Sequence, residues 1–278
     1  MIEALDHVAV AVSDLDIAAP AYEALLGRAP DWREEAAGGR HAWFQLGNMA
    51  LDIVQPEGPG ETGDRVRARL ADGGDGLWGL AFAVRDLAET RRILDRRGAP
   101  TAEPAALLST DAWKLAFIAP EATHGVPIAL AERERTQRRK AKVAIDADCV
   151  HALDHVVINT ANPDRALALY GARLGLDFRL DRSNPQWGSR LLFFRAGDAV
   201  VEIGSRLDAP VSDAPDRLSG LAWRVADPEA ARDRIAAAGF DVSEVRKGRK
   251  PGTAVFTVRS GVAGAPSLIL SASPGADD

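Results

Sequence analysis

Hydrophobic and polar positions follow the same order twice along this chain, which predicts two copies of one structural unit. The tetrapeptide LDHV at 5–8 opens an apolar stretch and returns as LDHV at 153–156. Each copy is followed by a segment with helical spacing, YEALLG at 22–27 and YGARLG at 170–175. Because these matches come in the same order in both halves, they indicate a tandem duplication.

A fainter repeat lies inside each half. Residues 79–97 and 220–238 both show an apolar strand, an aspartate at a turn and an amphipathic helix. Asp86 and Asp227 suit helix N-caps, and the glycines that follow the helices suit C-caps. Two β-type runs come after each helix, separated by glycine or proline. The sequence therefore predicts a strand–helix–strand–strand–strand module, present four times.

The alternation of side chains along the first strand of each half predicts which residues share a face. His7 lies on one face with small residues, and the valines lie on the other. His155 likewise shares a face with Val157 and Asn159. We expect the valine faces to contact helices and the histidine faces to line a concave pocket.

Composition sets limits on the kind of protein. A chain of 278 residues predicts two domains, which we place at 1–132 and 150–274, with a charged linker at 133–149. The net charge of −6 gives no sign of nucleic-acid binding. Cys149 is the single cysteine, so no disulfide within the chain and no thiolate metal cluster can form. No apolar run reaches membrane-helix length and a strand pattern begins at Met1, so we expect a cytoplasmic protein with no membrane partner.

The motifs together resemble a known family. The LDHV strand, the Y-x-x-x-L-G helix end, the G-(N/D)-x-x-(L/V)-(D/E)-I strand and THGVPI at 123–128 are similar to the vicinal-oxygen-chelate superfamily. Glyoxalase I, methylmalonyl-CoA epimerase, extradiol dioxygenases and bleomycin-binding proteins belong to it. The resemblance implies an α+β fold of four βαβββ modules forming two glyoxalase-like domains, each with a curved, cup-shaped mixed sheet around a ligand. It implies no particular reaction, because one fold hosts several chemistries.

The resemblance also implies where a metal ion would bind. Complete sites take a histidine from the first strand of a module and an acid from its last strand. The first module offers His7 and Asp52, and the third offers His155 and Glu202. The second and fourth modules have lost both positions, which are now Gly79, Ala129, Gly220 and Leu268.

One histidine and one carboxylate per cup are too few for a tight site unless a substrate also chelates. One divalent metal ion and no metal at all therefore remain equal alternatives. If modules one and three faced each other, all four side chains would form a complete set, but nothing in the sequence favours that pairing. Extradiol dioxygenase chemistry is not supported, because the resemblance places its iron ligands mainly in the fourth module.

Glu202 is the strongest catalytic candidate. It lies among valines and isoleucine, where an unpaired acid is costly to bury, so we expect it to face the cup near His155 and to act with it as a general base. The alternative is that both histidines are buried strand residues bound to a carboxylate or carbonyl.

Four further residues are candidates for substrate binding. Aromatic side chains on strands suit a flat apolar ligand and an arginine suits an anionic group, although core packing and a solvated surface explain them as well. These candidates are Trp187, Arg190, Phe194 and Trp223.

Two function hypotheses follow. The first is a glyoxalase-like isomerase or lyase that transfers a proton beside the carbonyl of a small molecule. The alternative is a metal-free protein that sequesters an aromatic or hydrophobic compound, as bleomycin-resistance relatives do. In both cases the partner is a small molecule, and the resemblance allows a homodimer.

Overall fold

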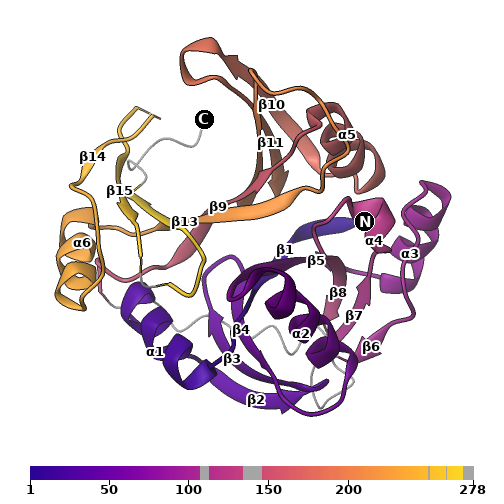
Figure 1. Ribbon diagram of the computed structural model, residues 1–278, viewed down its shortest axis with the longest axis horizontal. Coiled ribbons are helices and arrows are strands. Elements are labelled where there is room, and N and C mark those ends of the chain that lie inside the picture. The colour runs from indigo at the N-terminus through magenta and orange to yellow at the C-terminus, as the bar shows by residue number, and fades with distance from the viewer. Residues whose placement is uncertain (107–112, 134–145, 250, 261, 272–278) are drawn as a thin grey trace. The chain divides into compact units, whose positions relative to one another are not determined.

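Each half of the chain forms an eight-stranded mixed sheet. The computed structural model describes residues 1–106, 113–133, 146–249, 251–260 and 262–271 (Figure 1). The first half contains β1 (Ile2–Ala11), α1 (Leu15–Leu26), β2 (Trp32–Ala36), β3 (Gly39–Gln45), β4 (Ala50–Pro56), α2 (Glu61–Gly73), β5 (Gly76–Val84), α3 (Leu87–Arg96), β6 (Ala105–Ala106), β7 (Trp113–Phe117), α4 (Pro120–Thr123) and β8 (Ile128–Arg133). The second contains β9 (Ala152–Asn159), α5 (Pro163–Leu167), the π-helix η2 (Ala168–Arg173), β10 (Asp177–Asn184), the 3₁₀ turn η3 (Pro185–Trp187), β11 (Ser189–Ala196), β12 (Ala199–Arg206), β13 (Arg217–Arg224), α6 (Pro228–Ala237), β14 (Arg246–Lys247), β15 (Ala254–Val258) and β16 (Ser267–Ser271).

The strand orders confirm the predicted α+β class and its four modules. The first sheet has the order β2-β3-β4-β1-β5-β8-β7-β6, and the second has the order β10-β11-β12-β9-β13-β16-β15-β14. Modules one and two therefore share one sheet, and modules three and four share the other. Neither sheet combines strands of modules one and three.

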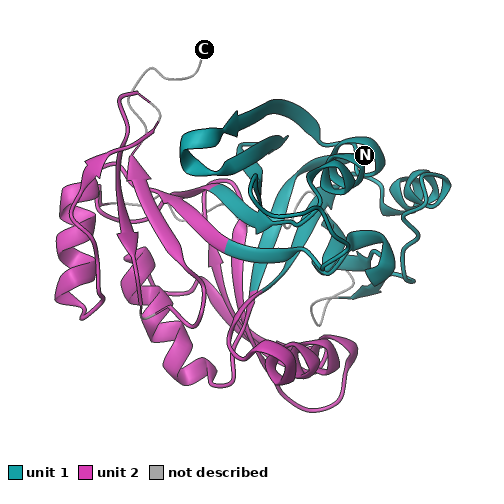
Figure 2. Cartoon of the chain, turned by 45° about the horizontal axis from the view of Figure 1, so that its top comes forward, with its two compact units in different colours: residues 1–9, 78–138, 155–219 teal, residues 10–77, 139–154, 220–278 magenta. Residues whose placement is uncertain are grey.

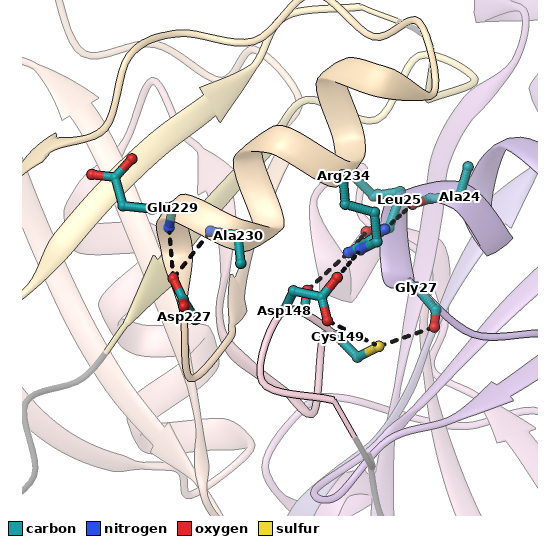
Figure 3. Close-up of polar contacts among 9 residues, drawn as sticks. All are labelled: Ala24, Leu25, Gly27, Asp148, Cys149, Asp227, Glu229, Ala230 and Arg234. Atoms are coloured by element: carbon teal, nitrogen blue, oxygen red, sulfur yellow. Dashed lines mark hydrogen bonds and ion pairs between the residues drawn. The ribbon is translucent and has the colours of Figure 1, made fainter.

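The predicted helix caps are present. The Asp86 side chain accepts a hydrogen bond from the amide of Glu89 at 2.8 Å. The Asp227 side chain accepts from the amides of Glu229 and Ala230 at 3.1 and 3.0 Å (Figure 3). Gly98 and Gly239 follow these helices with φ of 71° and 92°, in the left-handed region that glycine adopts without steric cost.

Two compact units divide the chain differently from the repeat (Figure 2). One comprises residues 1–9, 78–138 and 155–219, and the other comprises 10–77, 139–154 and 220–278. The first unit thus holds most of modules two and three, and the second holds most of modules one and four. The boundaries at 132 and 150 stay a prediction. Residues 134–145 of the predicted linker and 272–274 of the predicted second domain lie outside the described residues.

In the second unit, α6 is joined to the end of α1 (Figure 3). The Arg234 guanidinium donates to the carbonyls of Ala24 and Leu25, and its Nε lies 2.8 Å from a carboxylate oxygen of Asp148. Since α1 has no basic residue in its last turn, Arg234 supplies the positive charge that a helix C-terminus favours. Cys149 is buried beside this joint, and its thiol donates to the Gly27 carbonyl at 3.1 Å.

In the first unit, a buried aspartate holds the end of β9. The Asp216 carboxylate accepts from the Thr160 hydroxyl at 2.7 Å and from Arg165 at 2.8 Å. The Thr160 amide donates to the Gly204 carbonyl on β12 at 2.9 Å. Because Thr160 directly follows Asn159, these bonds hold the last residue of β9 beside β12.

Candidate functional site

The third module, in the first unit, has a sheet face that is partly open to solvent. Along β12, Val201 and Ile203 are buried, whereas Glu202 and its neighbours two residues away are partly exposed. On β9, Val156 and Ile158 are buried, His155 and Val157 are partly exposed, and Asn159 is exposed. The open face therefore carries His155, Val157 and Asn159 from β9, and Val200, Glu202 and Gly204 from β12.

His155 and Glu202 form a half-buried pair on this face. Nε2 of His155 lies 3.7 Å from Oε2 of Glu202, with side chains 18% and 19% exposed. This distance is within ion-pair range but too long for a hydrogen bond. Since the Glu202 side chain makes no hydrogen bond to any described residue, its carboxylate can accept a proton from a bound molecule.

The floor around the pair is largely apolar. Phe193 on β11 lies opposite Glu202, and Leu180 on β10 lies opposite Phe193. Leu191 lies opposite Gly204, and Arg182 lies opposite Leu191. These side chains surround the carboxylate with a surface suited to an apolar molecule, with a cationic group at its edge.

Three of the four predicted substrate-binding residues are placed elsewhere. Phe194 is fully buried on the opposite face, 6.0 Å from the Tyr170 ring and 5.2 Å from the Phe178 ring between centroids. Arg190 is bound to Asp181 and Asp164. Trp223 is buried in the other unit, where its indole donates to Ser267 at 3.2 Å.

Trp187 is the one substrate candidate that remains exposed. It ends η3 with 43% of its surface accessible, and the Arg182 guanidinium carbon lies 5.4 Å from its ring centroid. The aromatic residue beside Glu202, on the neighbouring strand, is Phe193, which the sequence prediction did not select. The alternation along β11 could have indicated it, but only once the pairing with β12 was known.

Asp52, the counterpart of Glu202, lies in a closed environment. It is 2% exposed and bound to Nδ1 of His41, with distances of 2.9 and 3.0 Å to its two oxygens. The His41 ring stacks on Trp43 at 5.8 Å between centroids. Burial alone lowers the pKa of His41, but attraction to Asp52 and their hydrogen bond outweigh burial, so the His41 pKa is raised. The sequence prediction gave His41 no role.

His7 is also held within a buried cluster. Its Nδ1 lies 2.8 Å from the Asp6 carboxylate, and its ring meets the edge of Trp113 at 5.5 Å. Arg133 lies over the Trp113 ring at 3.4 Å and bonds Asp6 at 2.8 Å. In the second half, Asp154 bonds Arg224 at 2.9 Å. This geometry matches the alternative interpretation of His7 as a buried strand residue bound to a carboxylate.

The predicted ligands do not fit a metal ion held by protein side chains. Among the described residues, one group of three or more histidine, cysteine or acidic side chains has ligand atoms within 4.8 Å of one another, formed by Asp146, Asp148 and Cys149. That group contains none of the predicted ligands. Within the described part of the chain, His155 and Glu202 are thus not joined by a third side-chain ligand at that spacing, and a usual protein site needs three or four.

The buried His41–Asp52 pair predicts a pH dependence of stability. The folded state raises the His41 pKa above its ordinary value of 6.5, so folding favours the protonated ring. This stabilisation is fully present below pH 6.5 and is lost as the pH rises through the folded-state pKa. Urea titrations from pH 5 to 9 should show a corresponding decline in the free energy of unfolding, which Asp52→Asn should flatten. Glu35→Gln makes an exposed change of the same charge on β2, the strand paired with that of His41, and it should keep the decline. Equal slopes in the wild type and Asp52→Asn would contradict the prediction.

Comparison with known proteins identifies the family. The family model of the Glyoxalase/Bleomycin resistance protein/Dioxygenase superfamily matches residues 6–117 and again residues 154–256. The chain belongs to this superfamily. A Bacillus subtilis (strain 168) protein described as uncharacterized protein YqjC is 30% identical over 139 residues, which are 49% of this chain and 96% of that protein.

Two solved structures resemble nearly the whole chain. A mutant of 4-hydroxymandelate synthase from Streptomyces coelicolor has a TM-score of 0.71 and 14% identity, covering 99% of this chain and 95% of that one. The Mn(II)-bound glyoxalase from Novosphingobium aromaticivorans has a TM-score of 0.65 and 15% identity, covering 97% and 82%. At these identities the likeness shows the fold alone.

A search of the described helices for a membrane-spanning segment found none of sufficient length and hydropathy.

Proposed function

We propose that the open face of module three binds a small, largely apolar molecule with a carbonyl group, and that Glu202 moves a proton at the adjacent carbon. His155 lies beside the carboxylate as its partner in the pair. The reaction class is that of an isomerase or a lyase. The observation that carries the proposal is the half-buried His155–Glu202 pair on a largely apolar sheet face.

The contrast between the two halves supports this assignment. Asp52 is enclosed and bound to His41, so it is not available to a substrate. The Glu202 side chain is partly exposed, and its carboxylate makes no hydrogen bond to any residue that the structure describes. A carboxylate within reach of a bound molecule can act as a general base, which typically contributes about 10²–10⁴-fold to a rate. Solved structures of the same fold include a synthase and a glyoxalase.

Sequestration without reaction is the second candidate function. It is favoured by the incomplete set of metal ligands among the described residues and by exposed apolar side chains near the site. Leu180 is 47% exposed and Trp187 is 43% exposed. An apolar compound bound there would cover both side chains, and such binding would need no metal ion.

The test is deuterium exchange. The wild-type protein is incubated in D₂O with a panel of ketones, aldehydes and acyl thioesters, and NMR follows deuterium at the carbon beside the carbonyl. We expect at least one panel member to exchange faster than without protein, both before and after treatment with EDTA. Binding without exchange across the panel would favour sequestration. Two results together would contradict proton transfer by Glu202 without a metal ion. EDTA would abolish the exchange, and the protein would hold about one divalent ion per chain that His155→Ala removes.

A further inference from the structure

Gly204 leaves a gap in the open face beside Glu202. Its φ is not in the left-handed region, so the backbone conformation does not require glycine. A Cβ built at Gly204 would lie 3.4 Å from Oδ1 of Asn159 and 3.5 Å from Cδ2 of Leu191, which is close to ordinary van der Waals contact. The corresponding residue of the first half is Val54, which is fully buried. The glycine therefore leaves a hollow of about one small group between these two side chains.

Asn159 supplies a polar wall for this hollow. It lies opposite Gly204 in the pairing of β9 with β12, at the exposed end of β9. Its side-chain amide makes no hydrogen bond to any described residue, and its first-half counterpart is the apolar Ala11. The backbone behind it is held by the bonds from Thr160 to Gly204 and Asp216. Oδ1 of this amide faces Gly204 in the structure. Because the exposed amide has no partner among the described residues, a half-turn of the amide group directs its NH₂ donors to the same place, where they suit a carbonyl oxygen.

We propose that the hollow over Gly204 receives the carbonyl oxygen of the bound molecule and that the Asn159 amide donates a hydrogen bond to it. This inference rests on the proposed function and specifies the polar group that the site recognises. It makes Asn159 a catalytic residue together with Glu202. The substrate class is a ketone, aldehyde or thioester whose apolar part covers Phe193 and Leu180.

The proton transfer balances without an oxidant or a further reactant. The C–H bond beside the carbonyl breaks, and the proton passes to the Glu202 carboxylate. The electron pair of that bond forms a C=C bond, and the carbonyl oxygen takes the negative charge. The Asn159 N–H group stabilises this charge more strongly than it stabilises the neutral carbonyl, which is the requirement for catalysis. Return of the proton to the same or the neighbouring carbon completes an isomerisation.

The test compares two probes that share a phenyl ring and a two-carbon chain and differ in the carbonyl oxygen. Acetophenone carries the carbonyl and ethylbenzene does not, and NMR titration of the ¹⁵N-labelled side-chain amides measures both affinities. We expect the wild type to bind acetophenone more tightly by about three- to tenfold, the range of one neutral hydrogen bond. Acetophenone should also shift the Asn159 amide signal.

Two variants and a control make the test specific. Asn159→Ala should bind both probes equally, and Gly204→Val, which restores the residue of the first half, should weaken acetophenone binding most. Arg206→Ala, an exposed change near the end of β12, should leave the preference unchanged. Each of three results would overturn the inference. The wild type binds both probes with equal affinity, the preference for acetophenone survives Asn159→Ala, or neither probe binds at millimolar concentration. If Glu202→Gln abolishes exchange while Asn159→Ala leaves exchange and preference intact, the proposed function stands and this inference falls.

Discussion

Glu202→Gln should lower the rate of deuterium exchange beside the substrate carbonyl by about 10²–10⁴-fold, the usual contribution of a general base. Glutamine keeps the shape of the side chain but has no carboxylate to accept a proton at pH 7. The neighbouring floor of Phe193 and Leu180 does not change, so ligand affinity should change much less than the rate. The measurement is a pair of experiments on the same variant, exchange by NMR and affinity by titration.

The internal repeat provides the control for this variant. Asp52→Asn makes the equivalent change in the first half, where the carboxylate is 2% exposed and bound to His41. If the variant is folded, its exchange rate should stay within about twofold of the wild-type rate. A side chain away from the reacting atoms contributes little to the activation free energy. Unchanged exchange in Glu202→Gln would remove Glu202 from the mechanism. Loss of exchange in both variants would indicate a structural effect instead.

Asp216→Ala should destabilise the protein by about 3–5 kcal/mol, the usual cost of removing one partner of a buried ion pair. The Asp216 side chain is fully buried and its partner Arg165 is 15% exposed, so the guanidinium would remain buried without its carboxylate. The Thr160 hydroxyl would also lose its acceptor. Urea denaturation followed by circular dichroism measures the change in the free energy of unfolding.

Asp213 supplies the matched control for this stability measurement. Its carboxylate lies 3.7 Å from the same arginine, but its side chain is 99% exposed. Exposed ion pairs contribute about 0–1 kcal/mol, so Asp213→Ala should change the stability by less than 1 kcal/mol. Equal losses in the two variants would show that burial of Asp216 is not the source of its effect.

The repeat and the modules could be predicted from the sequence because their signals are local. Strand alternation, helical spacing and capping residues depend on neighbours within a few positions. The same local pattern placed His155 on one face with Val157 and Asn159, and it marked Glu202 as an acid in an apolar strand. These patterns predicted the modules, and the resemblance of the motifs to the superfamily implied the fold class and the pairing of His155 with Glu202.

The tertiary structure decided which side chains face one another. Phe194 and Phe193 are neighbours in sequence, but the register between β11 and β12 places Phe193 on the Glu202 side and buries Phe194 beneath the sheet. A shift of one residue in that register would exchange them. His41 binds Asp52 only because β3 and β4 pair at that position. Contacts such as Arg133 with Asp6 join residues far apart in the chain, and no local pattern contains them.

The sequence by itself therefore determined the modules and the candidate residues for chemistry. Strand pairing and long-range packing decided which of those residues are buried and which are exposed at the candidate site.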